Sequence, residues 1–489
     1  MVYTLIRGGE EKMSNNTVYL ITVVVFMVAL AIIGIMISRG IKSQKDWMVA
    51  GKSLGIIPMA GTYFATIVSA ASIISYMGYY YLNGWPGWWN CAGTFLTSFL
   101  ACIWFAKRLR KAGCDTLPEY ISQRFGSQLA MPAAILVTIC TIALLSAQII
   151  GSVVVLQAFV DWDRVTCCVV LLVVFVAFTM IGGMKAVAWT DTICAFVIII
   201  GVWVMAATFL GDVGGFTAMN EQIAAINPDF VQAFSESITP PVALSWLVTW
   251  GICNFGAPVF IARFFSAESP EVASRSQGIT GIGLLLFYIP LIIIGLCGML
   301  LVPGIESQDA VFVTLVTTRL PALAGGIMFA AVMAAIISTA DSLLLLAAGT
   351  FSNDIYSKLK PNVSDKEILN VSRVATLVIG IGAVLLSFWF NDAIQFIQAR
   401  AVTLMGAAMA MLTMVGVVWK RANRTGAAVS MVAGFATACV WYALGQPGGV
   451  MAALPAVIVA FLVMVVVSKL TPPPPEEVIA KFFSVSETE

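Results

Sequence analysis

Apolar segments long enough to cross a lipid bilayer recur along almost the whole chain. Each comes close to or exceeds the roughly 18–20 residues that an α-helix needs to span a hydrocarbon core about 30 Å thick. Hydrophobic residues make up 60% of the chain and charged residues only 10%, which is typical of a membrane protein. The sequence therefore predicts an all-α polytopic membrane protein with about thirteen spans: 17–38, 54–82, 88–106, 130–160, 165–182, 187–210, 242–265, 278–302, 322–351, 370–390, 393–419, 427–444 and 450–469.

Basic residues are divided unevenly between the two sides of this predicted bundle. If the loop after the first span is cytoplasmic, most of the lysines and arginines lie on the inner side. The positive-inside rule then predicts an outer N-terminus and a cytoplasmic C-terminus. We expect an extracellular segment 1–16, one transmembrane domain over 17–470 and a short cytoplasmic tail over 471–489. This organisation predicts a multi-pass protein of the cell membrane, in contact with lipid; no obligate protein partner is evident, and a net charge of +1 gives no sign of nucleic acid.

The second and seventh predicted spans contain interruptions. Small and hydroxyl-bearing residues follow one another from Gly61 to Ser72, and Pro258 follows Gly256 in the seventh span. Proline removes a helical donor, and the polar groups that an opened helix frees must face protein, an ion or water. Interruptions five spans apart predict an inverted repeat with a binding site near the middle of the membrane. Glycine and proline are also common in membrane helices, where such kinks only aid packing.

The ninth predicted span carries an unusual cluster of oxygen atoms. Ser338, Thr339, Asp341 and Ser342 fall within about two helical turns of an otherwise apolar segment, although polar groups are costly inside a membrane. The backbone carbonyl of Ala335 lies on the same helical face as the Ser338 hydroxyl three residues later. Because hard cations prefer oxygen ligands, this cluster predicts half of a sodium site.

The second half of such a site is expected from the interrupted second span. There the carbonyls of Ala65 and Val68 lack internal helical donors if the helix opens. An alternative is that Ser338 and Thr339 only join helices by hydrogen bonds, each worth about 0.6 kcal/mol on average.

Two carboxylates lie within predicted spans, Asp191 in the sixth and Asp341 in the ninth. Intramembrane carboxylates are candidates for function by default. Together with Ser342 they can form a second cation site, or they can relay protons. The simplest alternative is that they cap a helix and pair with Lys185.

Three further polar residues are candidates for binding the solute. Arg400, in the eleventh span, can hold a carboxylate in its guanidinium fork, or it can extend outward and pair with Asp392. Gln148 and Asn254 can face a central cavity or bridge helices. We interpret Tyr79, Tyr80, Tyr81, Trp85, Trp88 and Trp89 mainly as an aromatic belt at the membrane interface, of which one or two members can line an outer gate.

Several motifs, in this order, resemble the sodium/solute symporter family. They are Thr116-Leu117-Pro118-Glu119-Tyr120-Ile121-Ser122-Gln123-Arg124-Phe125, Gly182-Gly183 running to Trp189-Thr190-Asp191, Phe255-Gly256-Ala257-Pro258 with Arg263-Phe264, and Ile337-Ser338-Thr339. The resemblance extends over roughly residues 15–470. It implies a LeuT-type fold of two inverted five-helix repeats, over 54–210 and 242–419, with one helix before them and two after.

The same resemblance implies ligand sets. The principal sodium site of the family maps onto the carbonyls of Ala65, Val68 and Ala335 and the hydroxyls of Ser338 and Thr339. A further sodium site of some members, including sialic acid symporters, maps onto Asp191, Ser338, Asp341 and Ser342. Asp341 departs from the small polar residue usual at its position, and the pattern from Ser338 to Ser342 resembles that of pantothenate-type members. Substrate positions of relatives map near Ser69, Ser72, Gln148 and Asn254.

These observations predict a secondary active transporter, not an enzyme, that carries a small organic solute by alternating access with sodium as the coupling ion. A pantothenate-like solute, another small carboxylate or an amino acid is expected. Sialic acid is disfavoured because the fourth span lacks the arginine that sialic acid symporters use. Proton coupling through Asp191 or Asp341 is the alternative. A channel or a membrane enzyme is less favoured, because the chain has neither a recognisable selectivity filter nor any histidine.

Overall fold

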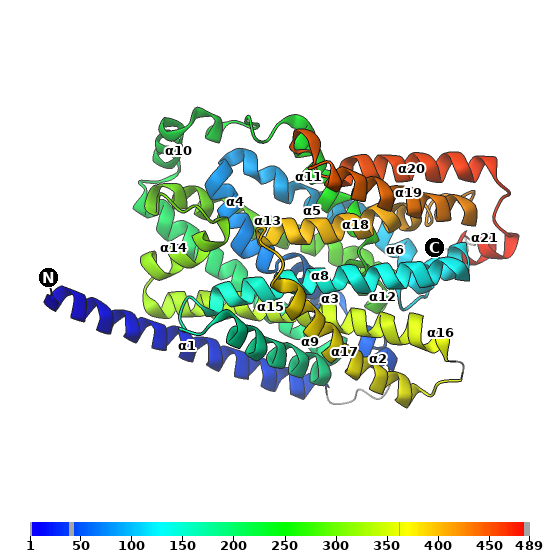
Figure 1. The fold of residues 1–489 in the computed structure, drawn as a ribbon, viewed down its shortest axis with the longest axis horizontal. Coiled ribbons are helices and arrows are strands. Elements are labelled where there is room, and N and C mark those ends of the chain that lie inside the picture. The colour runs from blue at the N-terminus through cyan, green and yellow to red at the C-terminus, as the bar shows by residue number, and fades with distance from the viewer. Residues whose placement is uncertain (1, 39–43, 361, 484–489) are drawn as a thin grey trace.

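The computed structural model of the protein describes residues 2–38, 44–360 and 362–483. Most helices run along the long axis of the molecule (Figure 1), and within the described residues only an isolated bridge between Leu54 and Ala267 has extended pairing. The helices are α1 Val2–Ser38, α2 Gln44–Val49, α3 Ile56–Ile67, α4 Tyr76–Asn83, α5 Trp89–Leu100, α6 Ala106–Lys111, α7 Leu117–Phe125, α8 Ala130–Leu156, α9 Arg164–Asp212, α10 Phe216–Ile226, α11 Pro240–Gly251, α12 Pro258–Ser266, α13 Pro270–Leu301, α14 Val311–Arg319, α15 Ala322–Thr350, α16 Ser357–Leu359, α17 Asp365–Ser387, α18 Ile394–Met414, α19 Arg424–Ala443, α20 Ala453–Leu470 and α21 Glu476–Phe483.

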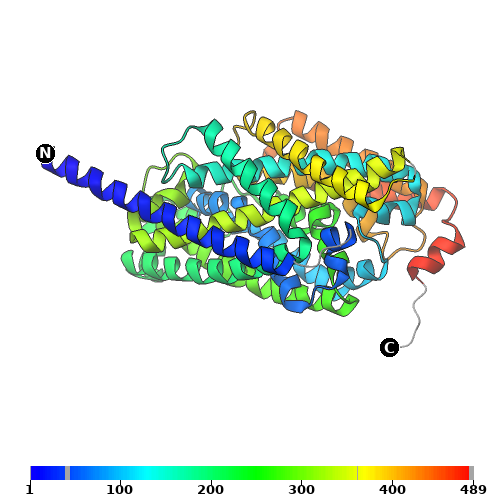
Figure 2. The same ribbon diagram turned by 90° about the horizontal axis from the view of Figure 1, so that it is seen from below.

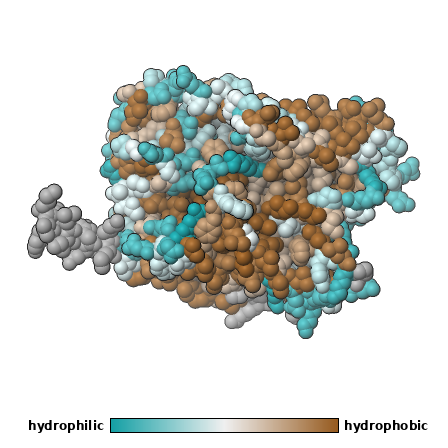
Figure 3. Space-filling view, in the orientation of Figure 1, coloured by the Kyte–Doolittle hydropathy of each residue, from teal (hydrophilic) through white to brown (hydrophobic). Residues whose placement is uncertain are grey.

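The surface has the pattern of a membrane protein. Apolar residues cover the middle of the face seen in Figure 3, and hydrophilic residues gather towards both ends of the long axis. Figure 2 shows α1 lying obliquely along the outside of the bundle. Its apolar part, Asn15–Ile37, has a mean hydropathy of 3.1 and is little buried by the rest of the protein. Such a helix is stable only where lipid covers its outer side.

The expected number of thirteen spans is not confirmed. Ten of the described helices are long and apolar enough to cross a membrane, and two bent helix pairs raise the number to 12 at most. The apolar helix Arg164–Met180 is shorter than these. It belongs to α9, which contains both the fifth and the sixth predicted spans and breaks between them at Gly183, where φ is +59°.

Both interrupted spans are bent, as the sequence predicts. Helix α3 ends at Ile67, and the following helical segment, Ala71–Asn83, is inclined to it by 61°. Segment Pro240–Gly256 and helix α12 meet at 52°, and α12 begins at Pro258, whose missing N–H is not needed in a first helical turn. The backbone therefore changes direction twice inside the bundle, and polar groups at these bends are available for binding.

Close backbone contact holds the second bend in place. A side chain at Gly406 of α18 would put its Cβ 2.2 Å from the Cβ and 2.4 Å from the Cα of Cys253, which begins the bend. We expect Gly406→Ala to lower the free energy of unfolding by about 1–3 kcal/mol, because overpacking displaces the backbone. Thermal unfolding of the purified protein measures this, with Gly382→Ala as the control, since the nearest atom to that Cβ is 4.0 Å away. Equal melting temperatures for the two variants would contradict the prediction.

Candidate functional site

The hydroxyl cluster of α15 meets the broken end of α3. The Thr339 hydroxyl donates a hydrogen bond to the carbonyl of Ala65 at 3.1 Å and to that of Ala335 at 2.9 Å. The Ser338 hydroxyl donates to the same Ala335 carbonyl at 3.1 Å. Val68 follows directly after α3, with φ of −85° and ψ of +86°. The structure thus places four of the five oxygen-bearing residues in mutual contact and the fifth, Val68, at the bend itself.

This arrangement has the chemistry that a monovalent cation needs. All five residues are buried, and their carbonyl and hydroxyl oxygens are neutral, so they can replace water around an ion without holding it irreversibly. The hydrogen bond from Thr339 to Ala65 also joins α15 to α3. This agrees with the alternative expectation that these hydroxyls serve to join helices. The two roles are compatible, because an ion between these oxygens would join the same two helices.

The two intramembrane carboxylates each accept a hydrogen bond from a threonine of another helix or helix segment. Thr62 of α3 donates to Asp191 at 2.6 Å, and Thr179 donates to Asp341 at 2.9 Å. Both aspartates are buried, and the second oxygen of Asp191 has no hydrogen-bond partner among the described residues. No ion pair joins Asp191 to Lys185 in the described part of the chain. Pairing with that lysine is therefore not what holds Asp191.

Arg263 is the residue that the sequence analysis missed. Its side chain is fully buried in α12, and its guanidinium donates to the Ser342 hydroxyl at 2.6 Å and to the Val259 carbonyl at 2.7 Å. Arg263 is therefore, like Arg400, a basic residue inside a predicted span. Arg263 lies within the predicted span 242–265, and a basic residue inside a span is a candidate for function, so the sequence alone could have indicated it.

A small central cavity of about 40 Å³ lies beside the hydroxyl cluster. Because sites for small molecules measure roughly 300–1,000 Å³, a small molecule fits here only when the lining side chains or helices move apart. Ser69, Ser72, Gln148 and Asn254 all line it, and so does Thr339. The structure therefore brings four of the five expected substrate residues to one cavity. The other lining residues are Thr66, Ile67, Tyr76, Thr94, Leu144, Trp250, Val259, Phe260, Leu343, Gln398 and Val402.

Two buried amides face this cavity in fixed orientations. The Gln148 oxygen accepts a hydrogen bond from the Ala70 N–H at 3.3 Å, while its nitrogen has no partner among the described residues. The Asn254 nitrogen donates to the Trp250 carbonyl at 2.7 Å, and here the oxygen is left without a partner. Each of these two lining residues thus has one buried polar atom, a donor on Gln148 and an acceptor on Asn254, without a partner among the described residues.

Ser69 and Ser72 lie at the bend itself. Gln398 of α18 donates to the Ser69 hydroxyl at 3.3 Å, and the Ser72 hydroxyl donates to the Ile67 carbonyl at 2.5 Å. Gln398 is a second residue that the sequence analysis did not select. It is an amide within a predicted span, as Gln148 is, and the same reasoning would have found it.

Arg400 does not belong to the cavity. Its guanidinium lies 2.5 Å from the Asp392 carboxylate, and the two side chains are 41% and 43% exposed. This is the outward pairing that the sequence analysis left open as the alternative to substrate binding.

Three of the six aromatic residues near the outer turn do not form a belt, whereas Trp85, Trp88 and Trp89 are half-buried. Tyr79, Tyr80 and Tyr81 are buried, so they do not lie at the lipid interface. The Tyr79 ring is 5.9 Å from that of Trp246 and 6.4 Å from that of Phe396, joining the two bent segments to α18. These residues therefore pack in the protein interior.

Comparison with known proteins agrees with this geometry. The sequence model of the sodium:solute symporter family matches residues 47–434. A sodium/proline symporter of Haemophilus influenzae is 27% identical over 451 residues, covering 86% of this chain and 88% of that protein. The high-affinity proline transporter PutP of Bacillus subtilis is 26% identical over 424 residues, covering 84% and 89%.

Solved structures show the same fold. A Na+-coupled sialic acid symporter in a substrate-bound, outward-open state aligns with a TM-score of 0.81 at 18% identity, over 93% of this chain and 98% of that one. The nucleobase-cation symporter MHP1 aligns with a TM-score of 0.55 at 15% identity, over 89% and 97%. The protein therefore belongs to the sodium:solute symporter family: it has the LeuT-type fold and is a sodium-coupled solute transporter, not an enzyme.

Proposed function

We propose that the protein takes up a small solute without net charge, with an amino acid such as proline as the first candidate. The observation that carries this proposal is the cavity, whose lining residues in the described chain include no charged side chain. A pantothenate-like solute or another simple carboxylate has a net negative charge and would meet no cationic side chain among the described lining residues, whereas the ammonium group of an amino acid offsets its own carboxylate. The names of the proline symporters that this chain resembles support the same class.

The two free amide atoms supply a matching pattern of contacts. The Gln148 nitrogen donates to the carboxylate of the solute, and the Asn254 oxygen accepts from its ammonium group. A hydrogen bond to a charged group is worth about 1.5–3 kcal/mol, and a buried partner left without it is costly. Apolar residues such as Leu144, Val259 and Phe260 surround the remaining atoms.

The sodium site that we propose consists of the carbonyls of Ala65, Val68 and Ala335 and the hydroxyls of Ser338 and Thr339. An ion there bridges α3 and α15 and stabilises the outward-open state. Thr339 contacts Ala65 and also lines the cavity, so ion and solute share one residue. Coupling requires the ion to bind one conformation more tightly than the other. Each charge moved inward across 100 mV then contributes about 2.3 kcal/mol.

For the second set, Asp191, Asp341 and Ser342, we propose a role along the path by which the ion leaves. The buried free oxygen of Asp191 and its contact with α3 support this role. Ser342 is the weakest member as an ion ligand, because the guanidinium of Arg263 already binds its hydroxyl.

We also propose the membrane topology. The C-terminus is cytoplasmic, residues 17–470 form a single membrane domain, and the two repeats are 54–210 and 242–419.

Uptake of labelled proline into proteoliposomes tests this function. We expect accumulation under an inward sodium gradient and none under a proton gradient alone. A thermal-shift screen of neutral, anionic and cationic solutes, with and without sodium, then identifies the solute. Uptake that ignores sodium would overturn the coupling ion, and stabilisation by simple carboxylates but not by amino acids would overturn the substrate class.

Removing the Gln148 side-chain amide should weaken the apparent affinity for the solute and leave the apparent affinity for sodium unchanged. We expect Gln148→Ala to raise the half-saturating proline concentration by about 10- to 100-fold, from the loss of about 1.5–3 kcal/mol. The sodium concentration for half-maximal uptake, measured at saturating proline, should stay unchanged. Gln157→Ala is the matched control, because the Gln157 amide donates to the Trp162 carbonyl at an exposed position. Equal proline constants for the two variants would remove Gln148 from the site.

A further inference from the structure

The chain enters the first bent helix through a strained turn. Ala50, Gly51 and Lys52 have φ values of +52°, +59° and +60°, so three successive residues are left-handed. Non-glycine residues in this region are strained and persist only where the surroundings hold them. The contacts of Lys52 supply that restraint.

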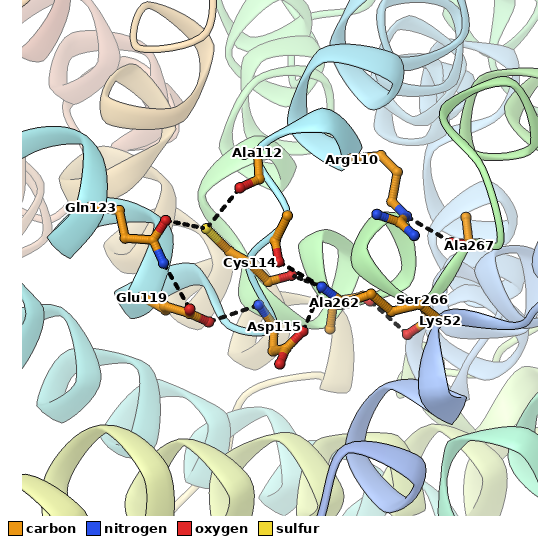
Figure 4. A network of polar contacts seen from close by, with 11 residues as sticks. Lys52, Arg110, Ala112, Cys114, Asp115, Glu119, Gln123, Ala262, Ser266 and Ala267 are labelled. Carbon is orange, nitrogen blue, oxygen red and sulfur yellow. Dashed lines mark hydrogen bonds and ion pairs between the residues drawn. The ribbon is translucent and has the colours of Figure 1, made fainter. Parts of the chain in front are cut away.

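The Lys52 ammonium is bound by the loop between α6 and α7 (Figure 4). It lies 2.7 Å from the Asp115 carboxylate and donates to the carbonyls of Gly113 at 2.6 Å and Cys114 at 3.2 Å. The ammonium thus makes two hydrogen bonds to backbone carbonyls and one ion pair. The Lys52 side chain is 13% exposed and that of Asp115 is 36% exposed, so the pair is largely buried at the Lys52 end and reaches solvent at the Asp115 end.

A second set of contacts joins the same turn to the end of the other bent helix. The Leu54 N–H donates to the Ser266 carbonyl at 3.2 Å, and the Glu268 N–H donates to the Leu54 carbonyl at 3.0 Å. Arg110 donates to the Ala267 carbonyl at 2.7 Å. The segments at the beginning of α3 and the end of α12 are thus tied to each other. The first is also bound to the loop between α6 and α7, and the second to α6.

The loop between α6 and α7 is itself held in place by side chains of α7. Glu119 of α7 accepts from the Asp115 N–H and from the Gln123 side chain, both at 2.8 Å. The Cys114 thiol contacts the Gln123 oxygen at 3.4 Å. The loop therefore presents its acceptors to Lys52 from a fixed position.

We propose that Lys52 is the gating residue at this end of the bundle. Together with Asp115 it forms a latch that holds the inner halves of α3 and α12 closed, and its release lets both halves move apart so that ion and solute leave. The strained turn favours release once the contacts to the loop are broken. This inference rests on the proposed alternating access, because a latch has a purpose only if this end opens during the cycle.

Cys114 is a native reporter of the latch. Its side chain is buried, and burial raises the pKa of its thiol to about 12, so it reacts slowly with maleimide while the latch is closed. The exposed Cys439 serves as an internal standard. Alkylation of each cysteine in the purified, lipid-reconstituted protein is measured by peptide mass spectrometry.

The variant arm tests the latch itself. Lys52→Met keeps the apolar stem and removes the charge, and we expect it to speed Cys114 labelling by about tenfold or more, as local opening becomes easier. Asp115→Asn should have the same direction of effect. Lys107→Met is the matched control, because Lys107 forms an exposed pair with Glu271 at 2.8 Å. Unchanged Cys114 labelling in both latch variants would overturn the proposal.

The wild-type arm needs no substitution and separates the latch from the proposed function. If sodium stabilises the state closed at this end, replacing potassium by sodium should slow Cys114 labelling and leave Cys439 unchanged. A fast, sodium-independent rate at Cys114 in the wild-type protein would show that the latch does not close, even if sodium-driven uptake is normal. Conversely, protection by the latch together with absent sodium-driven uptake would overturn the proposed function alone.

Discussion

Replacing Thr339 with alanine is expected to raise the sodium concentration needed for half-maximal uptake by roughly 10- to 100-fold, because a charge-assisted contact of about 1.5–3 kcal/mol is lost. Thr339 is the side chain that joins the two halves of the proposed ion site. Its hydroxyl reaches the Ala65 carbonyl of α3 and the Ala335 carbonyl of its own helix. Ser338→Ala should act in the same direction, and the double variant should show little sodium activation at all.

The measurement is initial uptake against sodium concentration at saturating solute. Thr376→Ala is a matched control, since that buried hydroxyl also donates to a carbonyl of its own helix, Ser372 at 2.9 Å, and lies in α17 away from the bends. If the variants and the control all show lower expression or a lower melting temperature, the effect is a general loss of stability and not a loss of sodium binding. Normal sodium activation in both Ser338→Ala and Thr339→Ala would mean that these hydroxyls only bridge helices.

The second large effect, on thermal stability and transport, is expected from substitution of Arg263. Substitution of Arg400, an arginine in an exposed ion pair, serves as the comparison. Arg263→Gln removes a fully buried cation that binds the Ser342 hydroxyl and the Val259 carbonyl. Each hydrogen bond to a charged group is worth about 1.5–3 kcal/mol, so we expect a marked fall in thermal stability and loss of transport. Arg400→Gln removes an exposed pair, which contributes about 0–1 kcal/mol, and should leave solute affinity unchanged.

Both variants are compared by melting temperature in detergent and by solute uptake after reconstitution. Arg263→Lys separates charge from geometry, because lysine retains a cation but lacks the planar guanidinium fork. We expect it to recover part of the stability lost in Arg263→Gln. A stable, fully active Arg263→Gln variant would contradict this account, and a weakened solute affinity in Arg400→Gln would return Arg400 to the substrate site.

Features encoded locally in the chain could be predicted from the sequence. Span length, the bends near Ser69 and Pro258 and the oxygen cluster at Ser338 all follow from neighbouring residues, whose spacing alone fixes which groups share a helical face. The four cavity residues chosen from spans two, four and seven do lie together. The count of spans could not be fixed, because α9 carries two predicted spans through a single break.

Contacts between distant segments could not be predicted in the same way. Thr62 and Asp191 are 129 residues apart, and the partner of Ser342 lies 79 residues before it. Such pairs depend on how helices are rotated and shifted against one another, which hydropathy does not encode. The buried tyrosines after the first bend were misplaced for the same reason: an aromatic run has the same composition at a lipid interface and in a packed interior.

The neutral lining of the cavity has an electrical consequence. If the solute is a zwitterion and the described lining residues bring no charge, the loaded carrier differs from the empty one only by the ions it holds. Current recorded from a membrane containing the protein would then count ions directly, and its ratio to solute flux would equal the number of sodium ions carried per cycle. The steepness of the voltage dependence would likewise reflect the depth of the ion site in the field and be the same for every solute accepted.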